Sequence, residues 1–570
     1  MFFVIPMFSM LVLSLKSQPL SNTFRVVPYT FTWDWANYHV VWSLYHSQLW
    51  RACYYAAAVT AGTLLVGYPV AYWIAFHGGR HKTTFLFLLL LPFFVSFVIR
   101  SLVWQFILSD GGLVFRGLEA IHLLPHGFHV LGTSTAVIWG ISYNALPFMI
   151  LPLYVALEKI DRRAVEAAKD LYARPSMVFR KVILPLSLPG VFAGILLTFV
   201  PASGDYVEAT ILGGPHTTMV GQVIQFLFLQ GEQYAQAAAL SNILMVLLLA
   251  GILLYARALG TRQIDEYLWM AIATAPGGQV VSPEQLPVRQ QRGLRLRALI
   301  LPAFTVLVIV YLIVPIAVMI LYSFNKGTAA TTAAAPKVSL IWQGFTLDWW
   351  RQWNGVPDLT AALWNSIIIA VTSTVVSAVL GTGMALALVR YRFRGQGALE
   401  MVMFLNIAAP EIVLGAGLLS LLVTLGTTRG LLTIFIAHVM FNVAFVAIVV
   451  RARLAGFSRE VEDAAKDLYA NAWGTFFYVT LPLIWPGIMA GALLAFALSI
   501  DDFIITNFVA GQTITFPLWV YGAVKTGIPP QVFVMGTAIF SAGIIIATIQ
   551  VFGGARRKRR AVTTTEDELA

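Results

Sequence analysis

Apolar runs of about 20 residues recur along this chain, and they restrict its possible folds more than any other feature. A helix of that length crosses the hydrocarbon core of a bilayer. Because lipid offers no hydrogen-bond partners, a lipid-exposed segment must pair its own peptide groups, as a helix does. The chain is therefore predicted to be an all-α integral membrane protein in contact with lipid. Clear examples are residues 54–76, 84–108, 135–157, 367–389 and 532–552.

The charge content supports the same conclusion. Only 11% of the 570 residues are charged, against about 25% in a soluble domain. The formal net charge of +11 is concentrated in short basic segments between apolar runs, which is typical of cytoplasmic loops rather than of a nucleic-acid-binding surface. We therefore expect no nucleic-acid partner and place both termini in the cytoplasm. The basic segments are residues 80–82, 162–163, 289–297, 390–394 and 556–560.

The first residues, MFFVIPMFSMLVLSLK, contain a short apolar run. They show neither a basic n-region nor a small-residue cleavage site, so no cleavable signal peptide is expected. The run is similar to residues 315–325, which close a longer apolar run at residues 298–322. The first helix is therefore expected to be shorter than its counterpart.

The heptad AAKDLYA occurs at residues 167–173 and again at residues 464–470. Around it, residues 167–205 align without a gap to residues 464–502, at an offset of 297 positions, with roughly half of the positions identical. Nearer the start of each half the offset is 314 positions. Such internal similarity at a fixed offset predicts a repeat architecture.

The repeat divides the chain into two pseudo-symmetric halves of about six transmembrane helices each. An even number of spans keeps both halves in the same orientation, as in transporters built from parallel repeats. The linker contains APGGQVVSPEQLPVRQQRG, a composition typical of connecting segments. We expect a first half at residues 1–258, a cytoplasmic linker at 259–297, a second half at 298–554 and a basic cytoplasmic tail at 555–570.

The repeated heptad belongs to two polar segments, near residues 162–189 and 459–486. Alanine, leucine, glutamate and lysine favour a short helix here, and the basic residues of the first segment place it on the cytoplasmic face. The sequence LPLSLPG follows, and its prolines are expected to break the helix where the next span begins. Because idle surface loops diverge, the repetition favours a binding role over a solvated loop.

These two segments resemble a known family. EAAKDLYARPSMVFRKVILP and DAAKDLYANAWGTFFYVTLP are similar to the EAA loop of ATP-binding-cassette (ABC) importer permeases. The resemblance implies a type I ABC importer permease fold, in which this loop forms a coupling helix that docks into a cytoplasmic ATPase. Tyr172 and Tyr469 stand where the family usually has glycine, so the bend is expected to be more helical than in the family. The implied coupling residues are Glu166, Ala167, Ala168, Asp170, Tyr172, Glu462, Asp463, Ala464, Ala465, Asp467 and Tyr469.

Further segments narrow the resemblance. Three of them, LPFFVSFVIRSLVW, ISYNALPFMILPLYVALEKID and SGDYVEATILGGP, are similar to the B-type permease of spermidine/putrescine importers. Three others, NIAAPEIVLGAGLL, LSIDDFIITNFVAG and FPLWVYGAVKTGIPPQV, are similar to its C-type partner. The chain resembles these two subunits fused head to tail. This implies polyamine import across a bacterial cytoplasmic (inner) membrane, with an extracytoplasmic polyamine-binding protein delivering the substrate.

The sequence contains no P-loop. The nearest approach, GGRHKTT at residues 78–84, lacks the required glycine spacing and does not follow a strand. We therefore expect no catalytic, cofactor-binding or metal-binding residue in this chain. ATP and Mg would be bound by a separate ABC ATPase, and the two coupling segments suggest two copies of it.

Acidic residues within the apolar runs are candidates for a substrate path, because an ionised side chain in the membrane is costly and is usually functional. Asp205 and Asp502 occupy matching positions, and Glu208 is expected one turn beyond Asp205 on the same helix face. Several carboxylates along one path suit a cation with several amines. The candidates are Asp205, Glu208, Asp501, Asp502 and Glu411.

Aromatic residues near these acids, Tyr206, Phe503 and Trp519, can add cation–π contacts. Arg100 is the one basic residue in the middle of an apolar run, and we expect it to pair with an acid rather than to bind substrate.

Several alternatives stay open at this point. The acids could instead cap helices in water. Ferric iron, which prefers oxygen ligands, or another small solute could be the cargo of a permease of the same superfamily. A secondary transporter driven by an ion gradient would also use intramembrane acids, but it needs no segments that dock an ATPase. A membrane enzyme would need a catalytic or metal-binding arrangement of side chains, and none stands out in the sequence.

Overall fold

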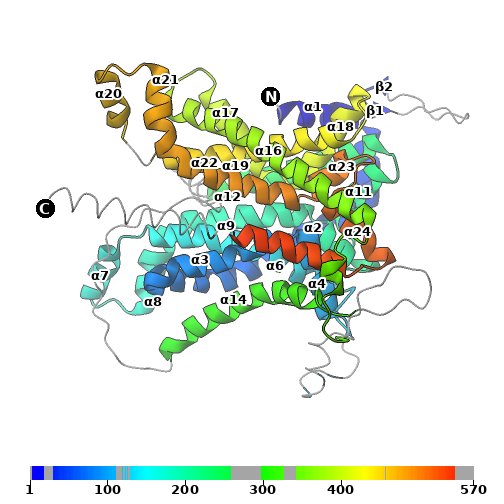
Figure 1. Cartoon of the computed structure of the whole chain (residues 1–570), viewed down its shortest axis with the longest axis horizontal. Coiled ribbons are helices and arrows are strands. Elements are labelled where there is room, and N and C mark those ends of the chain that lie inside the picture. Colours follow the sequence, from blue (N-terminus) through cyan, green and yellow to red (C-terminus); the bar gives the residue numbers. More distant parts are fainter. Residues whose placement is uncertain are drawn as a thin grey trace, which may run out of the picture.

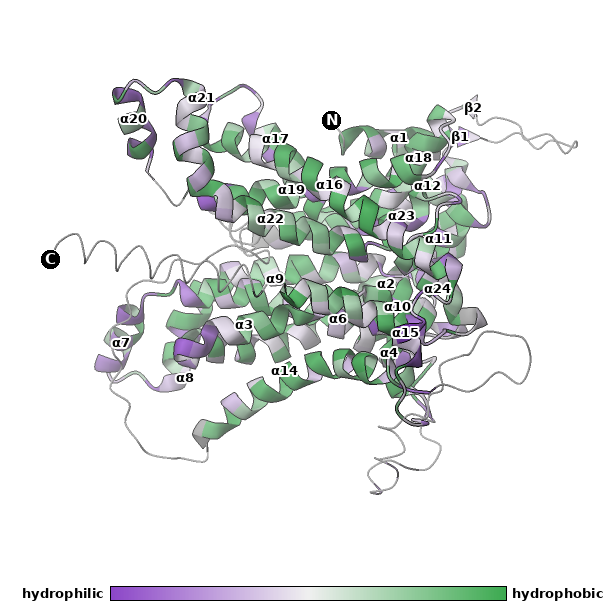
Figure 2. Ribbon diagram, in the orientation of Figure 1, coloured by the Kyte–Doolittle hydropathy of each residue, from purple (hydrophilic) through white to green (hydrophobic). Residues whose placement is uncertain are grey.

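The computed structural model describes residues 3–17, 30–110, 119, 122, 125, 129–258, 297–326, 342–455, 458–545 and 548. These residues are almost entirely helical, and most of the long helices run roughly along the longest axis of the molecule (Figure 1). Hydrophobic residues cover the middle of the helices, whereas hydrophilic residues gather towards the ends of the bundle (Figure 2). The expected all-α membrane architecture is confirmed.

The first half contains one short antiparallel pair of strands and a series of helices. The strands β1 (Lys16–Ser17) and β2 (Thr30–Phe31) pair with Lys16 opposite Phe31. The longer helices are α1 (Val4–Ser14), α2 (Ala36–His77), α3 (Lys82–Leu90), α4 (Phe97–Leu108), α6 (Ser134–Glu158), α9 (Leu184–Gly204) and α12 (Tyr234–Ala258). The shorter elements are η1 (Gly79–His81), η2 (Leu91–Phe94), α7 (Arg162–Asp170), α8 (Pro175–Val178), the π-helical η3 (Phe179–Ile183), α10 (Val207–Ile211), η4 (Pro215–Thr217) and α11 (Val220–Leu229).

The second half repeats most of this order. Its longer helices are α14 (Arg297–Tyr322), α16 (Pro357–Arg390), α17 (Gln396–Ala408), α18 (Glu411–Leu425), α19 (Leu431–Leu454), α22 (Leu481–Asp501), α24 (Phe516–Thr526) and a last helix at Gln531–Ile545. Its shorter elements are α15 (Asp348–Arg351), α20 (Glu460–Asp467), α21 (Ala472–Thr475), the π-helical η6 (Phe476–Thr480) and α23 (Ile504–Val509).

The number of spans fits the expected two halves. Within the described ranges, eight helices are long and apolar enough to cross a membrane, or up to ten if each of two bent helix pairs counts as one span. Each half contributes four of the eight and one bent pair. The shorter apolar helices α1 and Gln531–Ile545 add a sixth to each half.

Bent helix pairs lie at matching places in the two halves. The segment that ends at Phe94 meets α4 at 93°, and α17 meets α18 at 109°. Ser96 is the N-cap of α4, and Pro410, at an offset of 314 positions, is the N-cap of α18. Each break leaves a helix N-terminus within the bundle, and the unpaired amide groups there need partners from elsewhere.

The prolines after each coupling segment do not break the next span, contrary to our expectation. Pro175–Gly204 and Ala472–Asp501 each form one candidate span. Pro189 and Pro486 lie inside α9 and α22. Neighbouring helices and local changes to π-helical geometry accommodate proline in membrane helices, and η3 and η6 supply such a change just before the prolines.

The first helix of each half packs against the other half. Helix α14 lies against α2, α3 and α4 of the first half, and α1 lies against α18 of the second half as well as α12 of its own. The two halves of the repeat therefore interlock instead of meeting as separate bodies. The expected linker at residues 259–297 and the basic tail at 555–570 lie outside the described residues, except for residue 297.

Candidate coupling surface and substrate path

Helices α7 and α20, which carry the two repeated polar segments, lie at the same end of the bundle (Figure 1). Both are hydrophilic, in contrast to the spans that they connect (Figure 2). Two basic segments reach the same end, because Lys82 pairs with Glu158 at the end of α6 at 2.7 Å and Arg390 pairs with Glu462 of α20 at 3.1 Å. The basic segments and the two repeated polar segments therefore lie at one polar end of the helix bundle.

Most of the expected coupling residues lie on the outside of α7 and α20. Glu166 of α7 and Asp463 of α20 occupy the same position of the repeat, and both are exposed. Asp463 accepts a hydrogen bond from Lys466 at 2.8 Å, and this contact lowers the pKa of its carboxyl group, so that it stays ionised at neutral pH. The other exposed members are Ala167, Asp170, Tyr172, Ala464, Asp467 and Tyr469, while Ala168 and Ala465 are half-buried.

The expectation that the tyrosines make the bend more helical is wrong. Tyr172 and Tyr469 adopt left-handed backbone angles, with φ of 56° and 62°. The amide of Tyr172 donates to the Lys169 carbonyl at 2.9 Å and that of Ala173 to the Ala168 carbonyl at 3.2 Å. This pair of bonds is the Schellman motif, which normally ends in glycine.

The same motif closes α20, so each coupling helix ends by presenting a leucine and a tyrosine to the outside. Leu171 and Tyr172 are 82% and 96% exposed, and Leu468 and Tyr469 are 82% and 98% exposed. Large apolar side chains exposed together on a hydrophilic helix mark an interaction site.

Glu462 differs from the other coupling residues. Its side chain is buried and accepts a hydrogen bond from the Thr480 hydroxyl at 2.9 Å, in addition to the ion pair with Arg390. It therefore lies on the inner side of α20, away from the surface that Asp463 and Tyr469 form.

The five candidate acids lie near the opposite ends of α9 and α22. Asp205 and Asp502 are the C-caps of these helices, where the backbone turns from helical to extended. Glu208 is thus not one turn further along the same helix but belongs to α10. It still contacts Asp205, because its amide donates to Asp205 Oδ1 at 3.0 Å.

Glu208 is fully buried and only partly satisfied. Its Oε1 accepts hydrogen bonds from Ser101 Oγ at 2.6 Å and from the Asn144 amide. Its Oε2 has no hydrogen-bond partner within the part of the chain that the structure describes. A buried acceptor without a partner is costly, which makes this oxygen available to a donor from outside the chain.

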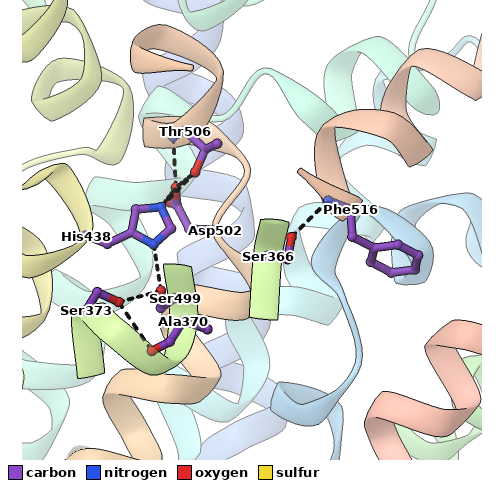
Figure 3. Close-up of polar contacts among 8 residues, drawn as sticks. All are labelled: Ser366, Ala370, Ser373, His438, Ser499, Asp502, Thr506 and Phe516. Atoms are coloured by element: carbon purple, nitrogen blue, oxygen red, sulfur yellow. Dashed lines mark hydrogen bonds and ion pairs between the residues drawn. The ribbon is translucent and has the colours of Figure 1, made fainter. Parts of the chain in front are cut away.

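Asp502 lies in a closed network of polar side chains (Figure 3). Its Oδ2 lies 3.2 Å from His438 Nε2 and accepts from the Thr506 amide at 2.8 Å and the Thr506 hydroxyl at 2.5 Å. His438 Nδ1 lies 2.6 Å from Ser499 Oγ, which is 3.0 Å from Ser373 Oγ. The hydrogen bonds described for Asp502 thus come from residues of the second half.

Asp501 joins the two halves. Its Oδ1 accepts a hydrogen bond from the Phe97 amide at the start of α4, and its Oδ2 lies 3.4 Å from Arg100. A carboxylate at a helix N-terminus is stabilised by the free amide groups there. The expectation that Arg100 pairs with an acid is confirmed.

Glu411 lies in the first turn of α18, at the matching break. Asp205, Asp501 and Asp502 lie close enough to Glu411 for their like charges to repel its carboxylate. The end of α9 reaches the same place, since a Cβ on Gly204 would lie 3.0 Å from Pro410. Acids from both halves are thus gathered where the two breaks and the two helix ends meet.

Aromatic residues line the same junction. The rings of Tyr206 and Phe503, which are matched positions of the repeat, lie 5.8 Å apart, and the Tyr206 hydroxyl accepts from Asn507 at 2.9 Å. Phe503 also contacts Tyr521, with ring centroids 4.6 Å apart. Tyr521 belongs to α24, from which the sequence had suggested Trp519 instead. His438, Ser101 and Asn144 had also not been predicted from the sequence.

Comparison with known proteins defines the class. Residues 67–262 and 377–560 match the family described as binding-protein-dependent transport system inner membrane component. The chain belongs to this family, with two copies of its domain in one polypeptide. It is a multi-pass inner membrane permease of an ABC importer, a non-catalytic component that works with an ATPase and a binding protein.

Each of the individual relatives aligns with a stretch of this chain that is about as long as one half. The putrescine transport system permease protein PotI of Escherichia coli (strain K12) is 34% identical over 260 residues, which are 44% of this chain and 89% of PotI. The spermidine/putrescine transport system permease protein PotB of Haemophilus influenzae is 37% identical over 258 residues, covering 45% of this chain and 88% of PotB. The corresponding PotC of Haemophilus influenzae is 32% identical over 248 residues, covering 43% and 93%.

Proposed function

We propose that this chain is the membrane permease subunit of a polyamine importer, carrying spermidine or putrescine from an extracytoplasmic binding protein across the bilayer. The proposal rests on the gathering of five carboxylates from both halves in the interior of the bundle. It is supported by the polyamine substrates named for PotI, PotB and PotC. The two termini would face the cytoplasm, as the charge pattern favours.

The carboxylates differ in the charge that they offer to a substrate. Asp501 has Arg100 as counter-ion, and Asp502 is in contact with His438 and Thr506. Among the described residues, no ion pair is found for Asp205, Glu208 or Glu411. A polyamine, which carries one ammonium group every few carbon atoms, can neutralise these three acids by exchanging water for carboxylate oxygens.

In this proposal, Asp501 and Asp502 have a structural role beside the path and do not bind the substrate. They hold the end of α22 against α4 and α19, and so fix where the substrate-facing acids lie. Tyr206 and Phe503 offer ring faces to the same ammonium groups.

On the cytoplasmic side, α7 and α20 would each dock one copy of an ABC ATPase. Each offers an acid, Glu166 or Asp463, followed by the exposed Leu-Tyr pair that ends the helix. Two such surfaces on one chain fit two ATPase copies. ATP and Mg would be held there by the ATPase alone.

The acid path is tested by paired neutral substitutions. In proteoliposomes that contain the chain, its ATPase and its binding protein, we expect Asp205→Asn with Glu411→Gln to lower spermidine uptake at least about tenfold, since an ion pair in a low-dielectric site contributes more than 1.4 kcal/mol. Docking of the ATPase should not change. The control is Asp358→Asn, an exposed acid in the first turn of α16.

Wild-type uptake by the double variant would contradict the acid path. Uptake of ferric iron instead of spermidine by the wild-type chain would replace the polyamine by a metal cargo with the same preference for carboxylate oxygens.

A further inference from the structure

Three matched positions beside the coupling helices carry apolar side chains in the first half and polar ones in the second. One position lies in the last turn of the long helix before the bent pair, one lies in the first turns of the coupling helix, and one closes the π-helical segment. The matched residues are Phe76 and Arg390, Val165 and Glu462, and Ile183 and Thr480.

The polar set forms one bonded cluster. Arg390 Nε lies 3.1 Å from Glu462 Oε2, and the Thr480 hydroxyl donates to Glu462 Oε1 at 2.9 Å. The side chains of Arg390 and Glu462 are each 11% exposed. Arg459, the N-cap of α20, adds a hydrogen bond from its guanidinium to the Arg390 carbonyl. The cluster therefore ties α16, α20 and η6 together at a single carboxylate.

The matched first-half residues are part of the hydrophobic core instead. Val165 and Ile183 belong to the main hydrophobic core, and Phe76 packs against that core. Val165 is 8% exposed and Ile183 is 3% exposed. The second-half set depends on a directional, charged contact, whereas apolar side chains at the matched positions can only contribute by burial.

We infer that Arg390, Glu462 and Thr480 form a positioning site that anchors the second coupling helix to the spans, and that Phe76, Val165 and Ile183 are the interchangeable apolar counterpart in the first half. This inference rests on the proposed docking of an ATPase to α20. Through the cluster, a movement of α20 reaches η6 and then α22, which runs without interruption to Asp501. Glu462 acts through these helices and does not touch the ATPase.

Loss of one partner leaves a buried charge without its counter-ion. Arg390→Phe and Glu462→Val alone should therefore misplace α20. We expect each to lower the spermidine transported per ATP hydrolysed roughly fivefold, within the range by which substitutions away from both ligands alter coupling. The milder Glu462→Gln keeps the shape of the side chain and should lower the same ratio less.

The decisive variant transplants the first-half residues. Arg390→Phe, Glu462→Val and Thr480→Ile together should restore the transport ratio to within twofold of the wild type, about the scatter expected of a repacked core. The measurement uses equal amounts of the complex assembled with the ATPase, so that poor folding alone does not lower the ratio.

The outcomes are distinct. Single variants with a wild-type ratio would overturn the inference, as would a triple variant as defective as the single ones, because Glu462 would then act through its charge on a partner. A wild-type chain that binds no ATPase would instead refute the proposed function. For comparison, Asp463→Asn should weaken docking of the ATPase, and the triple substitution should not correct it.

Discussion

At the residue scale, the two halves place different chemistry at matched positions of the same helices. His438 contacts Asp502 in the second half, whereas Asp205 in the first half has no histidine partner among the described residues. Glu208 is a buried acid, whereas its match, Ile505, is apolar. The repeat keeps the backbone and exchanges the side chains, so that one half holds its aspartate with a histidine and the other adds a second acid.

This exchange explains which residues the sequence could reveal. Asp205 and Asp502 were found because both halves share them, and Arg100 because a lone charge stands out in an apolar run. His438 has no counterpart in the first half, and a histidine in an apolar run is usually an ordinary core residue. Its contact with Asp502 follows from where the end of α22 lies, which cannot be deduced from the sequence.

The histidine contact makes a prediction for stability. His438→Ala should destabilise the purified chain by about 2 kcal/mol, because it removes one hydrogen-bond partner of a buried carboxylate. The thermal midpoint in detergent measures the change. Ser499→Ala removes the contacts of its hydroxyl with His438 and Ser373 but leaves Asp502 its own partners, and should cost about 1 kcal/mol. Equal midpoints for His438→Ala and the wild type would show that Thr506 alone satisfies the aspartate.

At the scale of elements, glycine sets the distance between neighbouring spans. A Cβ on Gly190 of α9 would lie 2.5 Å from Ala156 Cβ and 2.7 Å from the Pro152 carbonyl oxygen of α6. Backbone atoms cannot move aside as a flexible side chain can. Small residues of this kind allow membrane helices to approach closely, where dispersion contacts hold them together.

We therefore expect Gly190→Ala to separate α9 from α6 and to lower the stability by about 2 kcal/mol, as other overpacked sites do. The matched control is Gly62→Ala in α2, where an added Cβ meets no atom within 4 Å. That substitution should leave the thermal midpoint unchanged or raise it, because alanine favours helix. A fall of the same size in both variants would point to backbone effects rather than to packing.

The sequence predicted the spans better than their bends. The run at residues 84–108 was expected to be one helix, yet the chain turns before α4. Hydropathy is blind to such a turn, since both arms are apolar. What stabilises it is a contact from the other half, the Asp501 carboxylate on the Phe97 amide.

At the scale of the whole molecule, the repeat predicted two halves in parallel, and the coupling helices at one end of the bundle bear this out (Figure 1). The exchange of first helices was not predicted. Hydropathy and repeats give the number and direction of spans but carry no information about which spans touch, and that is decided by side-chain packing across the two halves.

Because the halves interlock through packing, the covalent link should be dispensable for assembly. We expect residues 1–258 and 297–570, produced as two chains in one cell, to co-purify and to transport spermidine at a reduced yield, since a linker contributes only an effective concentration. Co-purification through a tag on the second chain measures assembly. Failure of the two chains to associate, with each still inserted in the membrane, would show that the connecting segment has a structural task.

The place of α14 also has a consequence for how the protein is made. Translation runs from the N-terminus, and domains usually fold in that order. Here the flank of α2, α3 and α4 is covered by a helix that begins at Arg297 and ends at Tyr322. During synthesis, lipid acyl chains are therefore expected to cover that flank of the first half. Its packing is completed only after the ribosome has translated more than half of the chain.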